Sequence, residues 1–342
     1  MGLTPTTADD AGVSLARKMR FLSDPASYAH APQKVRVVET HMSFVFVAEA
    51  KTYKLKKPVR FPFLDFSTLN LREAMCREEL RLNRRLAPDV YLDVRPLTEQ
   101  PAGTLSIGGG GVVVDWLIEM RSLPERRMLD LMLAEKRVTS HEIALLARKL
   151  AEFYLKAQVS TIAPADYARR FFREQQINRE VLTARAFKLD HGRSSLALDS
   201  LDARLALDRP LLEERVRAGC VVEGHGDLRP EHVNFSDGIA IFDSLEFNAE
   251  LRQVDPFDEI AFLGVECAQL GAPEIGLELA EALAEKLGVG VPERLIPLYA
   301  AWRAVLRARL AVAHLLDPTP RTPEKWEPLA GRYLALAEKA LA

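Results

Sequence analysis

The hydrophobic pattern of the chain changes near residue 120, and this change restricts the possible folds more than any other feature. Before it, short runs rich in β-branched and aromatic residues alternate with polar turns, a pattern typical of strands. After it, long segments carry apolar residues at helical spacing, interrupted by one strand-like stretch over 221–247. We therefore expect an α+β fold with two lobes, a small β-rich N-terminal lobe over 1–120 and a larger, mainly helical C-terminal lobe over 121–342.

The N-terminal lobe is predicted to contain an antiparallel sheet with one inserted helix. Asn70, followed by Glu73 three residues later, favours a helix start that resembles a capping box. The glycine run Gly108–Gly111 lies between two strands with no helix after it, so we interpret it as a hairpin turn rather than a phosphate loop. The predicted helix is Leu71–Leu86, and the predicted strands are Val35–Val38, Phe44–Val47, Tyr53–Lys57, Tyr91–Val94, Thr104–Ile107 and Val112–Ile118.

The C-terminal lobe is predicted to be a set of helices, because its apolar residues recur at intervals of three and four. The boundary with the first lobe falls near Glu119–Ser122, and a cleft between two lobes is a common place for a ligand site. The predicted helices are Pro124–Leu133, His141–Ala157, Tyr167–Lys188, Ser194–Ala218, Ile275–Leu287, Pro297–Leu316 and Pro328–Leu341.

The charge and cysteine content exclude several classes of protein. The 46 Lys and Arg residues nearly balance the 48 Asp and Glu residues, so no basic field is available to hold nucleic acid. The polar N-terminus and the lack of a long apolar stretch argue against a membrane protein. The three cysteines are far apart and match neither a zinc spacing nor a disulfide framework, so we expect a cytoplasmic protein.

The strand-like stretch over 221–247 contains the densest group of chemically able residues in the chain. Two apolar arms flank an Asp237-Gly238 turn and are predicted to pair as a hairpin, which would bring Asp243 close to Asp227 and His232. Two converging carboxylates can divide the work, one orienting or deprotonating a hydroxyl and the other holding a divalent cation. The candidate residues of this stretch are His225, Asp227, Arg229, His232, Asn234, Asp243 and Glu246.

The motif HGDLRPEH is similar to the catalytic loop of the protein-kinase-like superfamily, which reads HRDLKPEN in protein kinases and HGDLHPGN in aminoglycoside and choline phosphotransferases. FDSLEFN stands where that superfamily has its DFG or IDW segment. With VETHMSFVFV, YKLKKP, CREELRLNRRLAP and DPFDEIAFL in the same order, the chain resembles a bacterial group of aminoglycoside phosphotransferase-like kinases. Some of these carry a P-loop ATPase domain behind the kinase-like module. This sequence has no GxxxxGK[ST] segment, so we expect the kinase-like module alone.

The resemblance implies a role for several residues of the catalytic loop. Asp227 corresponds to the aspartate that accepts or orients the proton of the substrate hydroxyl, and Asp243 to the aspartate that binds the Mg²⁺ bridging the ATP phosphates. Arg229 stands where a cation contacts the transferring phosphoryl group. His225 corresponds to a supporting residue, and Asp258 resembles a structural aspartate that holds the catalytic loop from below.

One position departs from the superfamily pattern. Five residues after the catalytic aspartate, the superfamily has an asparagine that binds metal, whereas this chain has His232. Imidazole is a poor ligand for Mg²⁺, which prefers oxygen. Either Asn234 or Glu246 therefore supplies the second ligand, or the site accepts Mn²⁺ or a single metal ion.

The nucleotide side of a kinase-like site needs a cation on a strand and a helix carboxylate that holds it. Lys54 and Lys56 lie on one face of their strand because side chains alternate. Glu79 interrupts the apolar stripe of the following helix, and a buried carboxylate needs a partner. We expect Lys54 to pair with Glu79, with Lys56 and Glu78 as the alternatives.

Two further segments are expected to contact ATP. No GxGxxG loop precedes Lys54, so Thr40, Ser43 and nearby backbone N–H groups of the ETHMS tip would cover the phosphates. The segment near the lobe boundary resembles a kinase hinge, in which the backbone of Glu119, Met120 and Arg121 would read adenine.

These features predict an ATP-dependent phosphotransferase that moves the γ-phosphoryl group to a hydroxyl of a small molecule. An alternative is a nucleotide-binding module that regulates a protein partner without phosphoryl transfer, an interpretation that the histidine at 232 favours. A third is a metal-dependent hydrolase built on His225, Asp227, His232 and Asp243. It ranks last because histidines at these spacings lack a coherent tetrahedral set.

Overall fold

The computed structural model describes residues 6–7, 12–61, 64–236, 238–317, 320 and 322–342. These residues form two compact units. The sheet unit contains the described residues up to Arg127 together with Ser236–Asn248, and the helical unit contains Met128–Phe235 and Ala249–Ala342. The sheet unit thus extends past residue 120 and takes in a segment from the middle of the C-terminal half, an arrangement that the sequence pattern did not predict.

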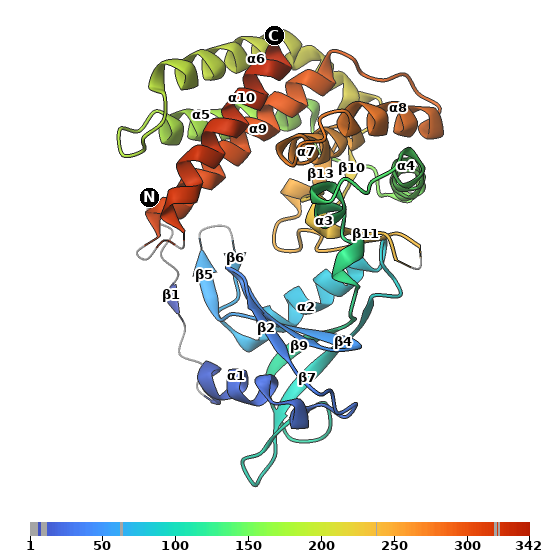
Figure 1. The fold of residues 1–342 in the computed structure, drawn as a ribbon, viewed down its shortest axis with the longest axis vertical. Helices are drawn as coiled ribbons and strands as arrows, with labels where there is room; N and C mark the ends of the chain where they lie inside the picture. Colours follow the sequence, from blue (N-terminus) through green and yellow to red (C-terminus); the bar gives the residue numbers. More distant parts are fainter. Residues whose placement is uncertain (1–5, 8–11, 62–63, 237, 318–319, 321) are drawn as a thin grey trace. The chain divides into compact units, whose positions relative to one another are not determined.

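The sheet unit is built on a six-stranded antiparallel sheet in the order β2-β3-β4-β9-β7-β8 (Figure 1). Its strands contain the β-branched and aromatic runs from which they were predicted, so the β-rich lobe is confirmed. A smaller sheet joins β1 (Thr6–Thr7), β5 (Val59–Phe61) and β6 (Leu64–Asp65), which were not predicted. The large sheet consists of β2 (Arg36–Glu39), β3 (Ser43–Ala48), β4 (Lys51–Lys56), β7 (Tyr91–Glu99), β8 (Leu105–Ile107) and β9 (Val112–Arg121).

The glycine run over 108–111 is not the predicted hairpin turn. Strands β8 and β9 lie on opposite sides of β7, so the run carries the chain across the end of β7 instead of joining two paired strands. Gly108, Gly109 and Gly111 all have positive φ, and a Cβ on Gly111 would lie 2.6 Å from the carbonyl oxygen of Glu99. Only glycine fits such a close backbone crossing without strain.

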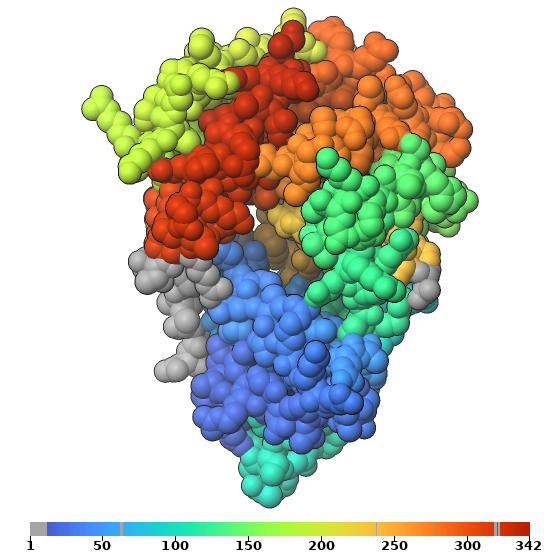
Figure 2. Space-filling model, viewed as in Figure 1, coloured from blue at the N-terminus to red at the C-terminus, as the bar shows by residue number. Residues whose placement is uncertain are grey.

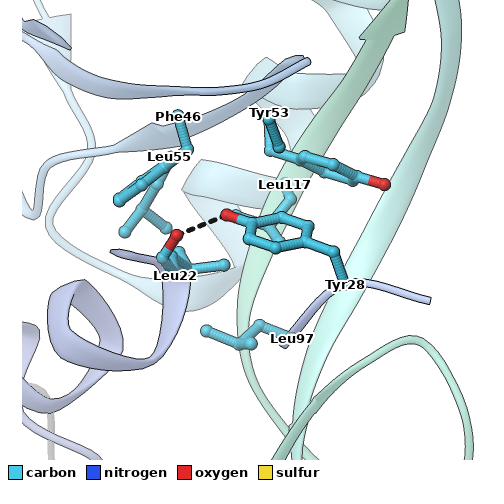
Figure 3. Packing of buried hydrophobic residues seen from close by; sticks show 8 residues of the cluster. Leu22, Tyr28, Phe46, Tyr53, Leu55, Leu97 and Leu117 are labelled. Carbon is cyan, nitrogen blue, oxygen red and sulfur yellow. Dashed lines mark hydrogen bonds between the residues drawn. The ribbon is translucent and has the colours of Figure 1, made fainter. Parts of the chain in front are cut away.

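Two helices cover the large sheet. Helix α2 (Leu69–Asn83) packs against β7 and β9, and α1 (Leu15–Ser23) contributes to the core on the other face. The predicted start of α2 was wrong, because Thr68 is the N-cap and its hydroxyl accepts a hydrogen bond from the N–H of Leu71. The α1-side core consists of Leu22, Tyr28, Phe46, Ala48, Tyr53, Leu55, Leu97 and Leu117 (Figure 3).

The helical unit contains the predicted helices, most of them within a few residues of the expected ends, and one that was not predicted. That helix, α7 (Pro256–Gln269), is buried on nearly all sides, so its sequence lacks the polar face by which a helix is recognised. No described helix is both long and apolar enough to cross a membrane. The others are α3 (Leu129–Ala134), α4 (Ser140–Lys156), α5 (Pro164–Leu182), α6 (His191–Arg217), α8 (Ile275–Leu287), α9 (Leu295–Ala313) and α10 (Trp326–Leu341).

Short strands surround the HGDLRPEH motif. Strands β10 (Val222–Glu223) and β13 (Gln253–Val254) pair in antiparallel fashion in the helical unit. The two predicted hairpin arms contain β11 (Val233–Asn234) and β12 (Ala240–Ile241), and Asp237 of the predicted turn lies outside the described residues. The chain passes from the helical unit to the sheet unit between these two strands.

Candidate functional site

The sheet unit contains a buried network of charges between β4 and α2. The alternation of side chains along β4 points Lys54 and Lys56 to the same face, where Glu79 of α2 is fully buried. One oxygen of Glu79 lies 2.8 Å from Nζ of Lys54, and the other lies 2.6 Å from Nζ of Lys56. One carboxylate therefore binds both lysines, whereas the sequence predicted a single pair.

The segment that follows β12 adds two more carboxylates to this network. Asp243 Oδ1 lies 2.7 Å from Nζ of Lys54, and Glu246 forms an ion pair with Lys56. The side chain of Asp243 is 44% exposed and that of Glu246 is 10% exposed. Asp243 is therefore the member of the network that faces solvent. Glu246 binds Lys56, and its role as a metal ligand stays a prediction.

The network keeps its lysines charged. Burial alone lowers the pKa of Lys54, but the carboxylates of Asp243 and Glu79 outweigh it and raise the pKa well above the ordinary value. Burial raises the pKa of Glu79, but Lys54 and Lys56 outweigh it and bring the pKa below the ordinary value. For Glu246, burial prevails over the attraction of Lys56, and the pKa is raised.

Asp243 adopts a backbone conformation that is unusual for a residue with a side chain. Its φ is 62°, in the left-handed region, where a non-glycine residue persists only if its surroundings hold it there. The hydroxyl oxygen of Tyr91 accepts a hydrogen bond from its N–H at 3.4 Å. The next residue, Ser244, donates its N–H to Oδ1 of Asn83 on α2 at 2.9 Å. The fold thus holds the Asp243 carboxylate toward Lys54.

The alternative pairing through Glu78 is wrong. Glu78 lies on the exposed side of α2 and pairs with Arg81, one turn along the same helix. Neighbouring residues on a helix point about 100° apart, so Glu78 and Glu79 face different surroundings. The pairing of Lys56 with Glu246 was missed, although the shared strand face of the two lysines was a signal for it.

The catalytic-loop motif of the helical unit is held by a buried carboxylate on α7. Glu259 accepts hydrogen bonds from the N–H groups of His225 and Gly226, the first at 3.0 Å, and from the hydroxyl of Tyr154 at 2.8 Å. Gly224 leaves room for it, because a Cβ there would lie 2.6 Å from the Glu259 carboxylate. Burial raises the pKa of Glu259 even though these three donors oppose the shift.

Glu259, not Asp258, therefore supports the loop. Asp258 instead forms two hydrogen bonds of 2.7 Å with the guanidinium of Arg303 on α9. Because consecutive residues of α7 point in different directions, the motif DPFDEIAFL did not reveal which of its acids faces the loop.

The two histidines of the loop bind the backbone of Asp227. His225 is fully buried, and its Nδ1 accepts a hydrogen bond from the N–H of Asp227 at 3.3 Å. His232 Nδ1 lies 2.8 Å from the carbonyl oxygen of Asp227, and the two imidazole rings stack with centroids 5.9 Å apart. This arrangement fixes the loop while the Asp227 side chain stays 33% exposed. The role of His232 as a metal ligand stays a prediction.

The other predicted residues of the loop have contacts within the helical unit. Nε of Arg229 lies 3.6 Å from Asp227 Oδ2, and its guanidinium also pairs with Glu231. Asn234 is fully buried, and its amide nitrogen lies 3.0 Å from the sulfur of Met128. Asp227 and Arg229 thus lie close together, and their catalytic roles stay predictions. The prediction that Asp243 lies beside Asp227 concerns residues of different units and stays a prediction.

The ETHMS tip forms a turn between β2 and β3 that Thr40 closes. Its hydroxyl accepts a hydrogen bond from the N–H of Ser43 and donates one to the carbonyl oxygen of Ser43, both at 3.0 Å. Lys57 caps this turn through the carbonyl oxygen of Thr40 at 2.7 Å. A phosphate-covering role for Thr40 and Ser43 stays a prediction, and it would require these bonds to rearrange.

The predicted hinge is misplaced. Glu119, Met120 and Arg121 lie inside β9 with β4 on one side and β7 on the other, so their backbone groups face sheet partners. The chain leaves the sheet after Arg121. A backbone that reads adenine would have to follow that point, because a central strand offers its N–H and C=O groups to its neighbours.

Comparison with known proteins gives relatives in sequence and in structure. No family model matches the chain. Uncharacterised proteins of Mycobacterium tuberculosis and Mycobacterium bovis are 29% identical to it over 313 residues, which is 90% of this chain and 60% of each relative. The chain therefore spans about 60% of the length of the curated relatives that it matches.

Several solved structures of choline kinases and aminoglycoside phosphotransferases resemble the chain. A choline/ethanolamine kinase family protein from Mesorhizobium loti has a TM-score of 0.55 at 13% identity, over 95% of this chain and 97% of that one. A choline kinase from Cryptosporidium parvum has a TM-score of 0.55 at 9% identity, over 94% of each chain. A thermostable aminoglycoside phosphotransferase in ternary complex with AMP-PNP and hygromycin B has a TM-score of 0.52 at 11% identity, over 94% of this chain and 96% of that one.

These likenesses establish the fold. The chain has the protein-kinase-like fold of choline kinases and aminoglycoside phosphotransferases, with a curled antiparallel sheet followed by a helical part, as the motif HGDLRPEH predicted. At such low identity the likeness does not extend to substrate, so function is argued from the site.

Proposed function

We propose that the protein is an ATP-dependent phosphotransferase that moves the γ-phosphoryl group to a hydroxyl of a small molecule in the cytoplasm. The observation that carries this proposal is the position of Lys54. Its ammonium lies between Glu79 and Asp243 on a central strand of a kinase-like fold. A lysine held in this way can bind the ATP phosphates, and the exposed carboxylate beside it suits a metal ion.

The donor chemistry of Asp243 fits Mg²⁺. The ion prefers oxygen ligands and keeps several waters, and the Asp243 carboxylate is nearly half exposed in a backbone conformation that the fold enforces. When bound, Mg²⁺ would neutralise charge on the phosphates. Lys54 would exchange part of its contact with Asp243 for phosphate oxygens. Lys56 and Glu246 would keep the segment after β12 in place beneath it.

The helical unit would supply the groups for the acceptor. Asp227 would accept the proton of the acceptor hydroxyl as the oxygen attacks the γ-phosphorus, and Arg229 would bind the transferring phosphoryl group. The hydrogen bonds of His225 and His232 to the Asp227 backbone support this role, because they fix the loop without using the carboxylate.

Calorimetry with MgATP and a screen for ATP consumption across hydroxylated metabolites test the proposal. Lys54→Met and Asp243→Asn are expected to weaken MgATP binding roughly tenfold or more, because charge-assisted contacts to phosphate are lost. Lys51→Met is the matched control, since Lys51 lies on the same strand but on the opposite face, where it binds Glu119. Asp227→Asn should keep MgATP binding and lose roughly a hundredfold in turnover. Wild-type protein that binds no nucleotide would contradict the proposal.

A second candidate function is a nucleotide-binding module that regulates a protein partner. The contact of His232 with the Asp227 carbonyl favours it, because that position does not offer the oxygen that Mg²⁺ prefers. MgATP binding without turnover on any acceptor, together with a cellular phenotype that Asp227→Asn leaves unchanged, would favour this function over the first.

A further inference from the structure

The sheet unit contains a cavity of about 540 Å³ on the face of the sheet opposite α2. The same alternation that points Lys54 toward α2 points Lys51 and Tyr53 of β4 into this cavity. Residues 26–30, which follow α1, form the opposite wall, and the Tyr28 ring lies beside that of Tyr53 with centroids 5.2 Å apart (Figure 3). The volume lies within the range of about 300–1,000 Å³ that is usual for small-molecule sites.

The cavity has a buried carboxylate and two cations. Glu119 is only 7% exposed, and it accepts hydrogen bonds from the Tyr53 hydroxyl at 3.3 Å and from the ammonium of Lys51. Nε of Arg95 lies 3.8 Å from the other oxygen of Glu119. Among the charged residues that line the cavity, one carboxylate thus faces two cationic side chains.

Arg95 lies near two carboxylates but forms no close ion pair with either of them. Its nearest carboxylates are Glu119 at 3.8 Å and Asp93 at 3.7 Å, and both distances exceed that of a hydrogen bond. Its Nε is buried without a hydrogen-bond partner among the described residues, while the side chain as a whole is 41% exposed. The exposed part of a guanidinium can bind a carboxylate or phosphate through two parallel N–H groups.

The glycine run explains how Arg95 reaches this position. A Cβ on Gly108 would lie 2.8 Å from Nη2 of Arg95, and the φ of Gly108 is +77°. A side chain at 108 would therefore displace the guanidinium. The teal projection in Figure 2, next to the blue N-terminal residues of the same unit, belongs to the part of the chain near residue 100. Through Gly108, the run thus leaves room for a residue that lines this cavity.

We propose that this cavity binds a small organic anion, a carboxylate or phosphomonoester with an apolar body. Arg95 and Lys51 would bind the anionic group. Phe21, Leu105 and Ile107, which also line the cavity, would contact the apolar part. The proposal is independent of the proposed phosphotransferase function, because its residues lie on the other face of the sheet from Lys54.

Calorimetry on the full chain with phenyl phosphate, benzoate and benzylamine tests it. Phenyl phosphate or benzoate is expected to bind and benzylamine is not. Arg95→Gln should weaken anion binding by about tenfold or more, because the bidentate contact is lost. Ala29→Phe should weaken it similarly by filling the mouth of the cavity without changing charge, since Ala29 is an exposed lining residue. Arg77→Gln, an arginine on α2 outside the cavity, should leave binding unchanged.

A phosphate group can also bind the Lys54 ammonium of the proposed nucleotide site, so Lys54→Met is included as a control. The proposal is supported if binding is kept in Lys54→Met and is weakened in Arg95→Gln and Ala29→Phe. Circular dichroism must show that the last two variants are folded. It is overturned if neither anion binds at millimolar concentration, if benzylamine binds equally well, or if Arg95→Gln leaves affinity unchanged. Binding that is lost in Lys54→Met but kept in Arg95→Gln also overturns it.

Discussion

Two buried glutamates, one in each unit, support the candidate site residues of their own unit in different ways. Glu79 binds two lysine ammonium groups, whereas Glu259 accepts hydrogen bonds from two backbone N–H groups and a tyrosine hydroxyl. The pKa of Glu79 is lowered because Lys54 and Lys56 outweigh burial, and that of Glu259 is raised because burial outweighs its neutral donors. Equal burial of the same residue type thus has opposite electrostatic consequences, set by whether the partners carry charge.

The largest expected effect is that of removing Glu79. Glu79→Ala leaves two buried lysines with one carboxylate fewer, which should reduce the free energy of unfolding by about 3–5 kcal/mol. Urea denaturation measures it. Lys54→Met with Glu79→Ala should cost less than the sum of the two single variants, because the pair is lost only once. A loss of unfolding free energy below about 1 kcal/mol in Glu79→Ala would show that Glu79 does not form buried ion pairs with Lys54 and Lys56.

Removing Glu259 should cost less, because its partners are neutral. Glu259→Ala leaves the N–H groups of His225 and Gly226 without their acceptor. This should reduce the free energy of unfolding by about 2–3 kcal/mol. Tyr154→Phe, which removes one donor and keeps the carboxylate, should cost about 1 kcal/mol. Hydrogen exchange at Gly226 should accelerate in Glu259→Ala and not in Glu79→Ala. Equal acceleration in both would contradict the contrast between the two glutamates.

The opposite pKa directions predict opposite responses to pH. Because the pKa of Glu259 in the folded protein is raised above its ordinary value of 4.5, the group costs stability at high pH, and that cost disappears as the pH falls through the folded pKa toward 4.5. The contribution of Glu79 is fully present above 4.5 and is lost as the pH falls through its lower folded pKa. As the pH falls from 7 toward 4.5, the wild type should therefore gain stability relative to Glu259→Gln.

The same pH series separates the two glutamates. Relative to Glu79→Gln, the wild type should show no change between pH 7 and 5 and should lose stability below pH 4.5. Denaturation curves of the three proteins at each pH are sufficient. Parallel behaviour of the two Gln variants across the whole series would refute the assignment.

The smallest effect is expected for Glu78, the neighbour of Glu79. Its pair with Arg81 is exposed on one helix, so Glu78→Ala should change the free energy of unfolding by about 0.5 kcal/mol or less. The pair Glu78→Ala and Glu79→Ala is therefore a matched test of burial with one residue type on one helix. Similar losses in both variants would mean that exposure does not decide the effect.

Local sequence patterns were sufficient for much of the candidate site. The period of two in YKLKKP places Lys54 and Lys56 on one face, and the interruption of an apolar stripe singles out Glu79. The order of HGDLRPEH and FDSLEFN in the chain also predicted the kinase-like fold, which the solved structures bear out. These features depend on neighbours a few residues apart, so periodicity reveals them.

Other features depend on contacts between distant segments, and no local pattern contains them. Strand β8 pairs with β7 on the side away from β9, which makes the glycine run a crossing rather than a turn. Helix α7 is buried on nearly all sides and so lost its amphipathic signature. Asp258 and Glu259 are adjacent on α7, so their side chains point about 100° apart and only Glu259 faces the catalytic loop. The role of each of these acids and glycines depends on which distant segment it packs against, and residue type alone does not reveal that.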